Sequence, residues 1–403
     1  MRRMMIALVG AALLLGLATV RAQGGPPTVA GCTVFPADNL WNTRVDSALV
    51  HPNSAAYIAN INANGGQSVH PDFGEDPTYG IPWATVPGSQ PLVPVDFYYP
   101  DESDPGPYPI PPDAPVEGGG DRHVLIIDQD NCILYEMFDS TFNGPPSNSW
   151  SAGSGAVFDL GSNALRPEGW TSADAAGLPI FPGLARCEEA NSGVINHALR
   201  FTVRRTQRAY IYPARHFASS LTDANYPPMG LRFRLKADYP IDALPLQAKT
   251  IATALKQYGM ILADNGSNWF INGETNPGCW DDDQLNTLKA IPGTAFEVVV
   301  NSGLEPSSTS AAPARTVFNL ATPTLTWLPV SGAQGYNLQI SSSATFASGM
   351  TQTYLIPSGE SWTATPALVR GIYYWRTCAR DAGGVCGGWS STETFAVIVP
   401  TVS

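Results

Sequence analysis

The stretch "RHVLIIDQDNCILYEMF" (residues 122–138) contains two short apolar runs separated by residues that favour turns. Runs of this length and composition, joined by a polar turn, are typical of an antiparallel β-hairpin. In the register that pairs Ile127 with Cys132, His123 lies opposite Glu136 at the margin of an apolar face. The stretch therefore predicts a hairpin that brings an imidazole and a carboxyl group together.

The predicted His123–Glu136 pair suits acid–base chemistry. Burial raises the pKa of a carboxyl group, and a nearby imidazolium lowers it. A carboxyl group tuned in this way can serve as a general acid or base. A structural cross-strand pair explains the same two residues equally well, so both interpretations stay open here.

Further strand patterns follow along the chain. Residues 230–239 alternate between apolar and basic side chains, and residues 294–300 are rich in β-branched residues. One helix is expected over residues 244–258. With 38 glycines, 36 prolines and 14% charged residues, the chain favours long loops on a β scaffold. We therefore predict an all-β fold with one helix, in which a large β-sandwich or jelly-roll-like domain spans residues 23–302 and is rich in loops over residues 23–120.

The C-terminal part is expected to form a separate small β unit over residues 317–399, after a Ser/Ala/Pro-rich linker at 303–316. Its features are Trp327, the alternation Tyr336-Leu338-Ile340, the strand Tyr374-Trp375-Arg376 and the loop Gly388-Trp389-Ser390. With these features the segment resembles a bacterial fibronectin type III domain. The resemblance implies a small β-sandwich that serves as a spacer or a binding accessory on a secreted enzyme.

The N-terminus has the features of a cleavable secretory signal peptide over residues 1–22. Arg2 and Arg3 precede an apolar run at residues 6–20, and a small-residue cleavage site ends at Ala22. No later apolar run is long enough to cross a membrane. We therefore expect a secreted, extracellular protein without membrane insertion.

The six cysteines form an even set, which in an exported chain favours disulfides over a metal site. Cys378 and Cys386 lie on either side of a predicted hairpin loop and are expected to pair. The remaining four allow three connectivities, of which Cys187–Cys279 with Cys32–Cys132 is preferred.

The charge balance limits the classes of partner. The chain has 22 basic and 34 acidic residues. Loss of Arg2, Arg3 and Arg21 with the signal peptide leaves 19 basic residues and a net charge of −15. An acidic surface argues against nucleic acid and anionic membranes as partners. An extracellular polysaccharide is the expected partner, and the protein is expected to be a monomer.

A second hairpin is predicted over residues 193–216, "GVINHALRFTVRRTQRAYIYPARH". His197 lies in its apolar row, and a return strand at 209–213 would bring Arg215 and His216 to His197 at the open end. Such a cluster could bind an anion, orient a sugar or hold a metal. The alternative is that His197 is a hydrogen-bonded core residue.

Several loop residues complete the candidate site. Trp170 and Asp174 lie in a loop rich in small residues, and Asp264 lies at a predicted Asp-Asn-Gly turn. Tryptophans in loops are a common platform for sugar faces, and we single out Trp83, Trp170 and Trp269 for this role. The run Asp281-Asp282-Asp283 could ligate calcium, but it more simply caps a short helix.

These features favour a secreted polysaccharide-active enzyme without a cofactor. As a glycoside hydrolase it would use Glu136 or Asp174 as the acid. As a lyase it would use Arg200 or Arg215 to neutralise a uronate and His197 or His216 as the base.

A non-catalytic extracellular protein that binds glycan or protein is one alternative. A metal enzyme is another, and its histidine ligands would come from His70, His123, His197 and His216. The sequence has no phosphate-binding loop, no H-E-x-x-H motif and no G-x-S-x-G motif.

Overall fold

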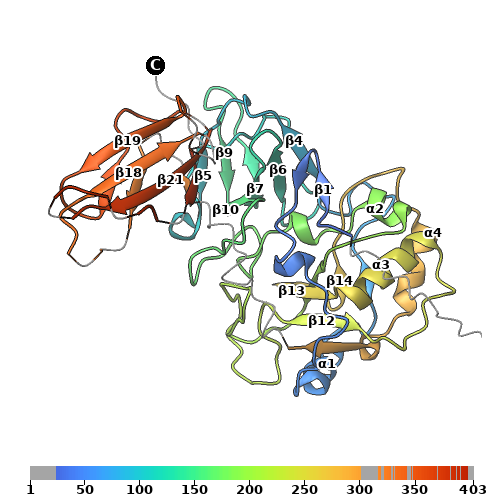
Figure 1. The fold of residues 1–403 in the computed structure, drawn as a ribbon. Helices are drawn as coiled ribbons and strands as arrows, with labels where there is room; N and C mark the ends of the chain where they lie inside the picture. Colours follow the sequence, from blue (N-terminus) through green and yellow to red (C-terminus); the bar gives the residue numbers. More distant parts are fainter. Residues whose placement is uncertain are drawn as a thin grey trace, which may run out of the picture.

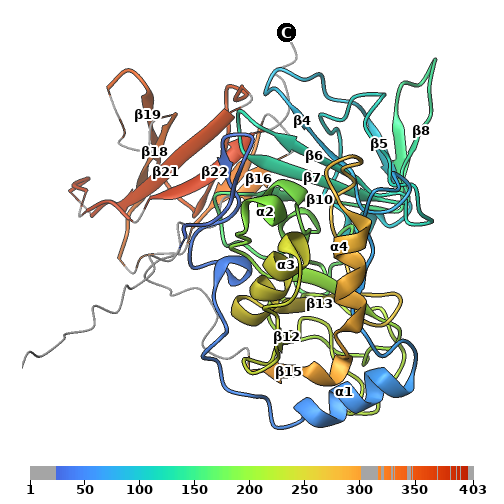
Figure 2. The same cartoon turned by 90° about the vertical axis from the view of Figure 1, so that its right-hand side faces the viewer.

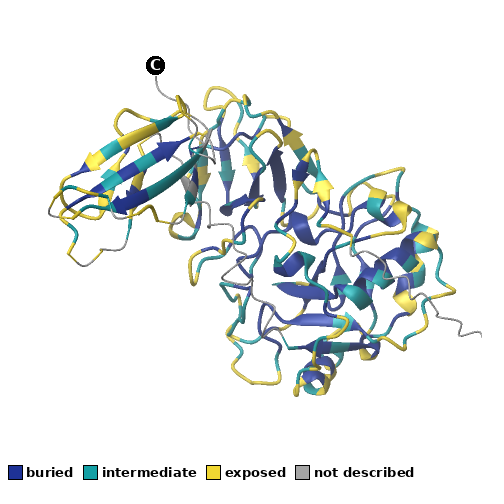
Figure 3. Ribbon diagram, viewed as in Figure 1, coloured by how far each residue is buried: buried dark blue, intermediate teal, exposed yellow. Residues whose placement is uncertain are grey.

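The computed structural model describes residues 24–300 and, with short gaps, residues 316–397. The predicted signal peptide and almost all of the predicted linker lie outside the described residues. The fold is mainly β, with 29% strand and 14% helix, which confirms the predicted class. Figure 3 shows that the buried residues concentrate in the sheets and the helices beside them, whereas the exposed residues lie in connecting loops and on the outer strands.

The first large sheet has four strands and contains the predicted hairpin. In sheet order the strands are β10 (Ser154–Asp159), β7 (Ile133–Phe138), β6 (Val124–Asp128) and β4 (Trp83–Val86). Three smaller strands, β5 (Val95–Phe97), β9 (Trp150–Ala152) and β8 (Thr141–Phe142), form a neighbouring sheet, and β1 (Thr28–Val29) pairs with β2 (Cys32–Thr33). Both faces of β6 and β7 are buried, because they pack against this small sheet on one side and against the main core on the other.

The second large sheet has six strands and carries most of the candidate site. In sheet order they are β15 (Phe296–Val299), β12 (Arg232–Leu235), β13 (Met260–Asn265), β11 (Leu199–Val203), β14 (Phe270–Ile271) and β3 (His70–Pro71). The helices are α1 (Ser54–Ala63), α2 (Cys187–Ser192), α3 (Leu246–Gln257) and α4 (Asp282–Asn286). Figures 1 and 2 show α3 beside this sheet, with α2 and α4 next to it and α1 near β15.

Helix α3 is the helix that the sequence predicted, and its ends follow the expected chemistry. Its apolar residues Ile251 and Leu255 recur at helical spacing and are fully buried. Gly259 follows the helix with a φ of +69°, and a Cβ atom there would lie 2.2 Å from the carbonyl oxygen of Phe233. Glycine is therefore required where the chain turns from α3 into β13. Helices α1 and α2 were not predicted, whereas α4 is the short helix expected after Asp281.

A β-bulge in the second sheet determines which side chains share a face. β11 and β13 are parallel, and Arg200 pairs with Ile261, but the register shifts so that Thr202 pairs with Asp264. Paired residues of neighbouring strands point to the same side of a sheet, and side chains alternate along each strand. Without the extra residue, Asp264 would point to the face opposite Arg200. The bulge therefore places Asp264 on the same face as Arg200.

The C-terminal residues form a small β-sandwich. Its main sheet has the order β16 (Thr316–Phe318), β22 (Glu393–Val397), β21 (Gly371–Ala379), β18 (Tyr336–Ser341) and β19 (Thr351–Ile356). β17 (Thr324–Thr326) pairs with β20 (Ser361–Thr363). Trp327 packs edge-on against Tyr336, with ring centroids 5.4 Å apart, and both belong to a hydrophobic core of this unit.

Two details of strand pairing differ from the sequence predictions. In the first hairpin, Leu125 pairs with Glu136 and Ile127 with Leu134, so the predicted register is wrong by two residues, although the shared face is preserved. The hairpin predicted over residues 193–216 is wrong. β11 pairs instead with β13 and β14, whose residues lie about sixty positions further along the chain.

All three predicted disulfides are present: Cys32–Cys132, Cys187–Cys279 and Cys378–Cys386. Disulfides of this number are typical of an oxidising, extracytoplasmic environment. Among the described residues, no helix is long and apolar enough to cross a membrane.

The disulfide Cys32–Cys132 attaches the N-terminal segment to the turn of the first hairpin, and we expect it to stabilise the protein strongly. It spans 100 residues, whereas Cys378–Cys386 spans eight. Replacing Cys32 and Cys132 together by serine should lower the free energy of unfolding by about 2–5 kcal/mol in denaturant titrations. The matched double variant at Cys378 and Cys386 should lose less, and equal losses would contradict the loop-length argument.

Candidate functional site

Most of the side chains that the sequence singled out meet around one loop, which we call the 170–181 loop (Trp170–Phe181). It connects β10 to the short 3₁₀ helix η3 (Phe181–Gly183). The backbone of this loop accepts hydrogen bonds from His123 and His216, and donates others to Glu136. Its Asp174 side chain forms an ion pair with Arg200. Residues from both large sheets thus converge on a single segment.

The Arg200–Asp174 ion pair is the most deeply buried contact of the site. The Nε of Arg200 donates to Oδ2 of Asp174 at 2.7 Å, and Nη2 donates to Oδ1 at 2.9 Å. Nη2 also lies 3.2 Å from Oδ2 of Asp264, and Nη1 donates to Oδ1 of Asn272. Burial alone would lower the pKa of Arg200, but the ion pair with Asp174, together with the charges of Asp264 and Glu117, outweighs it and raises this pKa. The guanidinium is therefore charged, and each of its three nitrogens has a hydrogen-bond partner.

Among the accessible carboxyl groups of the site, Asp264 is the one whose pKa is shifted most strongly by its surroundings. Its side chain retains 21% exposure, whereas Asp174 is fully buried. Burial, followed by repulsion from Asp174, raises the pKa of Asp264 to about 7 despite the ion pair with Arg200. The structure therefore has a partly exposed carboxyl group that retains its proton close to neutral pH.

Glu117 supplies a second accessible carboxyl group, and its pKa is shifted downward. Its Oε2 lies 2.6 Å from Nδ1 of His123, and the Nε2 of that histidine faces the carbonyl oxygen of Ala173 at 3.1 Å. Burial is the largest single effect and would raise the pKa of Glu117, but the hydrogen bonds and charge of His123, together with the charge of Arg200, outweigh it and lower this pKa. The same pair raises the pKa of His123 against the effect of burial. Glu117 is thus held as a carboxylate, with 16% of its side chain exposed.

Asp72 and Asn272 extend the site across the second sheet. Arg200 lies opposite Asn272, whose backbone N–H donates to the Arg200 carbonyl oxygen at 3.2 Å. Asp72 is the next residue after β3, and its N–H donates to the carbonyl oxygen of Ile271. Burial raises the pKa of Asp72, Glu117 raises it further, and Arg200 lowers it. These residues therefore share the face and the electrostatic environment of Arg200.

Glu136 supports the site from inside the protein. Its carboxyl oxygens accept the backbone N–H groups of Ile180, at 2.9 and 3.0 Å, and Phe181, at 2.8 Å. The side chain is fully buried, and burial raises its pKa to about 7. With no exposed surface, Glu136 cannot contact a substrate in this conformation. Its role in the structure is to fix the end of the 170–181 loop, and its predicted pairing with His123 is wrong.

Arg215, His216 and Trp170 lie at the start and on the outer side of the 170–181 loop. His216 Nδ1 faces the carbonyl oxygen of Ala175 at 2.8 Å, and Arg215 pairs with Glu168 at 2.6 Å. The half-buried Trp170 ring packs against the guanidinium of Arg166 at 5.5 Å. Their predicted catalytic and binding roles remain predictions.

His197 lies outside this arrangement. Its Nε2 is 3.1 Å from Oε2 of Glu189, and its Nδ1 is 2.8 Å from the carbonyl oxygen of Ala198. Arg186 also binds Glu189, and the interactions with Arg186 and His197 together outweigh burial and lower the pKa of that carboxyl group to about 2. The predicted meeting of His197 with Arg215 and His216 is wrong, because it depended on the incorrect hairpin. The environment of His197 matches the alternative of a hydrogen-bonded core histidine.

The predicted role of Trp269 in a sugar-binding platform is wrong, because its side chain is buried. Trp269 is fully buried, and its Nε1 donates to Asn62 inside the main core, so it cannot contact a sugar. Trp83 is half-buried, where it packs edge-on against Phe181 and donates to Glu274 at 2.6 Å. Long loops here bury their tryptophans rather than display them.

The described residues contain no group of three or more His, Cys, Asp or Glu side chains arranged to hold a metal ion. His123, His197 and His216 have the separate partners given above, and the ring of His70 stacks on Phe270. In the acidic run, Asp281 accepts the N–H of Gln284 and caps α4, as expected for the simpler interpretation.

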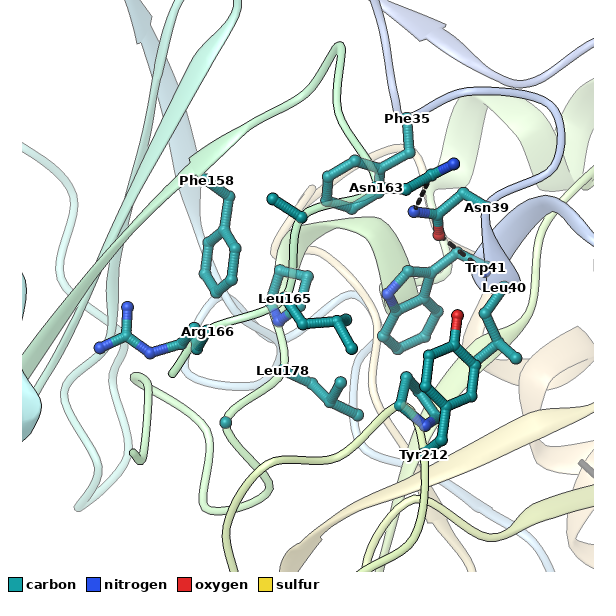
Figure 4. Close-up of a pocket in the computed structure, with 14 residues that line it drawn as sticks. Phe35, Asn39, Leu40, Trp41, Phe158, Asn163, Leu165, Arg166, Leu178 and Tyr212 are labelled. Carbon is teal, nitrogen blue, oxygen red and sulfur yellow. Dashed lines mark hydrogen bonds between the residues drawn. The ribbon is translucent and has the colours of Figure 1, made fainter. Parts of the chain in front are cut away.

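Residues 177–179 of the 170–181 loop also line a small pocket, together with residues from other segments (Figure 4). The rings of Trp41, Phe158 and Tyr212 surround it. Its volume of about 30 Å³ is the space occupied by about one water molecule. The pocket is therefore too small for a sugar ring, and the accessible carboxyl groups lie elsewhere.

Sequence patterns identified some of these residues and missed others. Glu117, Asp72 and Asn272 were not predicted. Glu117 lies in a glycine-rich stretch six residues before His123, and Asp72 and Asn272 each follow a very short strand. The sequence signal that could have identified Asp72 and Asn272 is an acidic or amide residue directly after a strand.

Comparison with known proteins assigns no function to the chain. No family model matches it, and no curated protein is similar to it. Among solved structures, a Fn3-like protein from Clostridium thermocellum is similar, with 24% identity over 23% of this chain and 99% of that chain, at a TM-score of 0.17.

The raised pKa of Asp264 predicts a pH-dependent gain in stability for Asp264→Asn. In the wild type, ionisation of a group with a raised folded-state pKa lowers stability as the pH rises from about 4 through about 7. Asparagine does not ionise, so D264N should match the wild type near pH 4 and exceed it by ~1–3 kcal/mol near pH 8. Denaturant titrations at the two pH values measure this difference.

Asp281→Asn is the matched control, because Asp281 is a half-buried capping residue whose hydrogen bonds to Gln284 lower its pKa. Asn caps helices as well as Asp. D281N should show no gain as the pH rises. If D264N and the wild type keep the same difference at both pH values, Asp264 ionises normally and the electrostatic description of the site is wrong.

Proposed function

We propose that the protein is a secreted glycoside hydrolase whose acid–base pair is Asp264 and Glu117. One observation carries the proposal: two accessible carboxyl groups around Arg200 have pKa values displaced in opposite directions. Pairs of titratable groups tuned apart in this way identify the acid and the base of an enzyme that works near neutral pH. Glycoside hydrolysis is the reaction that most commonly uses two carboxyl groups in these roles.

Each residue has a distinct role in the proposed reaction. Asp264, protonated near neutral pH, donates its proton to the oxygen of the leaving sugar. Glu117, held ionised by His123, acts on the other side of the bond as base toward water or as nucleophile. Arg200 is a positioning residue, because each of its three nitrogens donates to a protein partner, namely Asp174, Asp264 or Asn272.

The charge of the site favours hydrolysis over elimination and neutral over acidic sugars. Four carboxyl groups, Asp72, Glu117, Asp174 and Asp264, surround Arg200, with His123 as a second cation. A lyase requires a free cation to neutralise a uronate, and the Arg200 guanidinium is already neutralised by its own partners. A uronate would meet net negative charge here, so a neutral polysaccharide is the proposed substrate.

Features outside the site support an extracellular role. The three disulfides require an oxidising environment, and the proposed signal peptide would provide the export route. The small C-terminal β-sandwich, which resembles a fibronectin type III domain, would act as a spacer or an accessory for binding. A glycan-binding protein without catalysis remains the second proposal, and it has no need for a protonated carboxyl group at neutral pH.

The proposal predicts the kinetics of two substitutions on neutral glucan, xylan or mannan. Asp264→Asn and Glu117→Gln should each lower kcat/KM by about 10²–10⁴-fold, measured as new reducing ends. The wild-type pH profile should fall as the pH rises through about 7, the pKa of Asp264. This falling limb should be absent from the residual activity of D264N. No unsaturated product should form.

Glu188→Gln is the control, because Glu188 is an exposed carboxyl group on α2. It should retain wild-type activity. If the wild type releases no reducing ends from any of these polysaccharides, or if D264N is fully active, the hydrolase proposal is overturned. Binding without hydrolysis would then favour the non-catalytic protein.

A further inference from the structure

The edge of the second sheet displays an aromatic pair next to the proposed acid–base residues. The rings of His70 and Phe270 stack with their centroids 4.2 Å apart and their planes 14° from parallel. Both side chains are half-buried, whereas the residues that follow them, Pro71 and Ile271, are buried. The pair thus occupies the less protected of the two faces at this edge.

Strand register places the aromatic pair on the same face as the site. Thr202 pairs with Phe270, and Phe270 pairs with His70, so these three side chains form one row across β11, β14 and β3. Arg200, Asn272 and Asp72 form the adjacent row, two residues along each strand. Two residues along a strand correspond to about 7 Å. The two rows therefore lie side by side, one aromatic and one polar.

The bulge in β13 completes this arrangement. Asp264 pairs with Thr202, which belongs to the aromatic row, and it also contacts Arg200, which belongs to the polar row. The proposed acid is consequently in line with both rows on one face of the sheet. A sugar that presents its glycosidic oxygen to Asp264 would extend toward Phe270 or toward Asn272 and Asp72.

We propose that the stacked pair His70–Phe270, with Asp72, forms a sugar-binding subsite for a neutral polysaccharide beside Asp264. An aromatic ring offers a flat apolar surface to the C–H face of a sugar. The carboxyl group of Asp72, one row away, accepts hydrogen bonds from the hydroxyl groups of the same chain. This inference rests on the proposed function, because it gives the pair a role through its position next to the acid.

Substitution of Phe270 tests the subsite directly. D264N serves as the background, because it should bind polysaccharide without hydrolysing it. Its Kd for soluble neutral glucan, xylan and mannan is measured by affinity electrophoresis and calorimetry. Phe270→Leu keeps the apolar volume but removes the flat ring, so it should raise the Kd about tenfold or more. Phe270→Tyr keeps the ring and should bind as the background does.

Phe142→Ala is the matched control, because Phe142 is a half-buried phenylalanine on β8 of a different sheet. It should leave the Kd unchanged. Thermal unfolding of each variant identifies losses caused by misfolding, and F270L is expected to fold. In the hydrolytic background, F270L should raise KM by a factor similar to the change in Kd, while kcat falls much less.

The outcomes separate this inference from the proposed function. If D264N binds a polysaccharide that the wild type hydrolyses, and F270L binds it equally well, the subsite is overturned and the hydrolase proposal stands. If the wild type hydrolyses none of the polysaccharides and D264N binds none, both proposals are overturned. Loss of binding in F270L together with retention in F270Y and F142A supports the subsite.

Discussion

The buried guanidinium of Arg200 is the constraint on which the site depends. A charged group inside a protein must be paired, because an unpaired buried charge costs several kcal/mol. Here the partners come from three separate segments: Asp174 from the 170–181 loop, Asp264 from β13 and Asn272 from the end of β14. Any movement of one segment would leave the guanidinium or a carboxylate without its partner. The ion pair therefore fixes the 170–181 loop against β11 and sets the position of Arg200 beside the accessible carboxyl group of Asp264.

The same constraint leaves more negative than positive charge around Arg200. Asp174 takes both of the parallel donors of the guanidinium, so Asp264 receives only a weaker third contact at 3.2 Å. This contact does not compensate for the removal of the Asp264 carboxyl group from water, and the pKa of Asp264 consequently rises to about 7. Such an arrangement reduces stability above the pKa, which is a common property of functional sites and an uncommon one of purely structural ion pairs. The raised pKa of Asp264 thus lowers the stability of the folded protein and, at the same time, leaves a proton on Asp264 that can be transferred near neutral pH.

The sequence predicted those parts of the fold that depend on local pattern and missed those that depend on distant pairing. The 122–138 hairpin is local, and its existence was predicted, although its register was wrong by two residues because Asp128 pairs with Ile133 and Cys132, with a φ of +53°, belongs to the turn. The alternation around His197 correctly indicated a strand, but a period of two cannot distinguish a hairpin partner from β13, about sixty residues away. Asp174, Arg200 and Asp264 were each singled out. Their meeting could not be predicted, because it depends on a bulge that inverts the facing of Asp264.

Burial of the tryptophans shows why composition was a poor guide to the binding surface. Trp269 packs among Phe201, Phe233 and Phe296, because a chain with long loops and few helices must fill its core with large side chains from loops and strand ends. Trp269 lies in the turn before β14, with a φ of +62°, whereas Phe270 is the first residue of the strand and is half-buried. The turn before β14 therefore directs a core aromatic residue inward, whereas the first residue of β14 is an accessible aromatic that shares a face with Asp264. The position of an aromatic side chain relative to the sheet, rather than its residue type, decides whether it can meet a ligand.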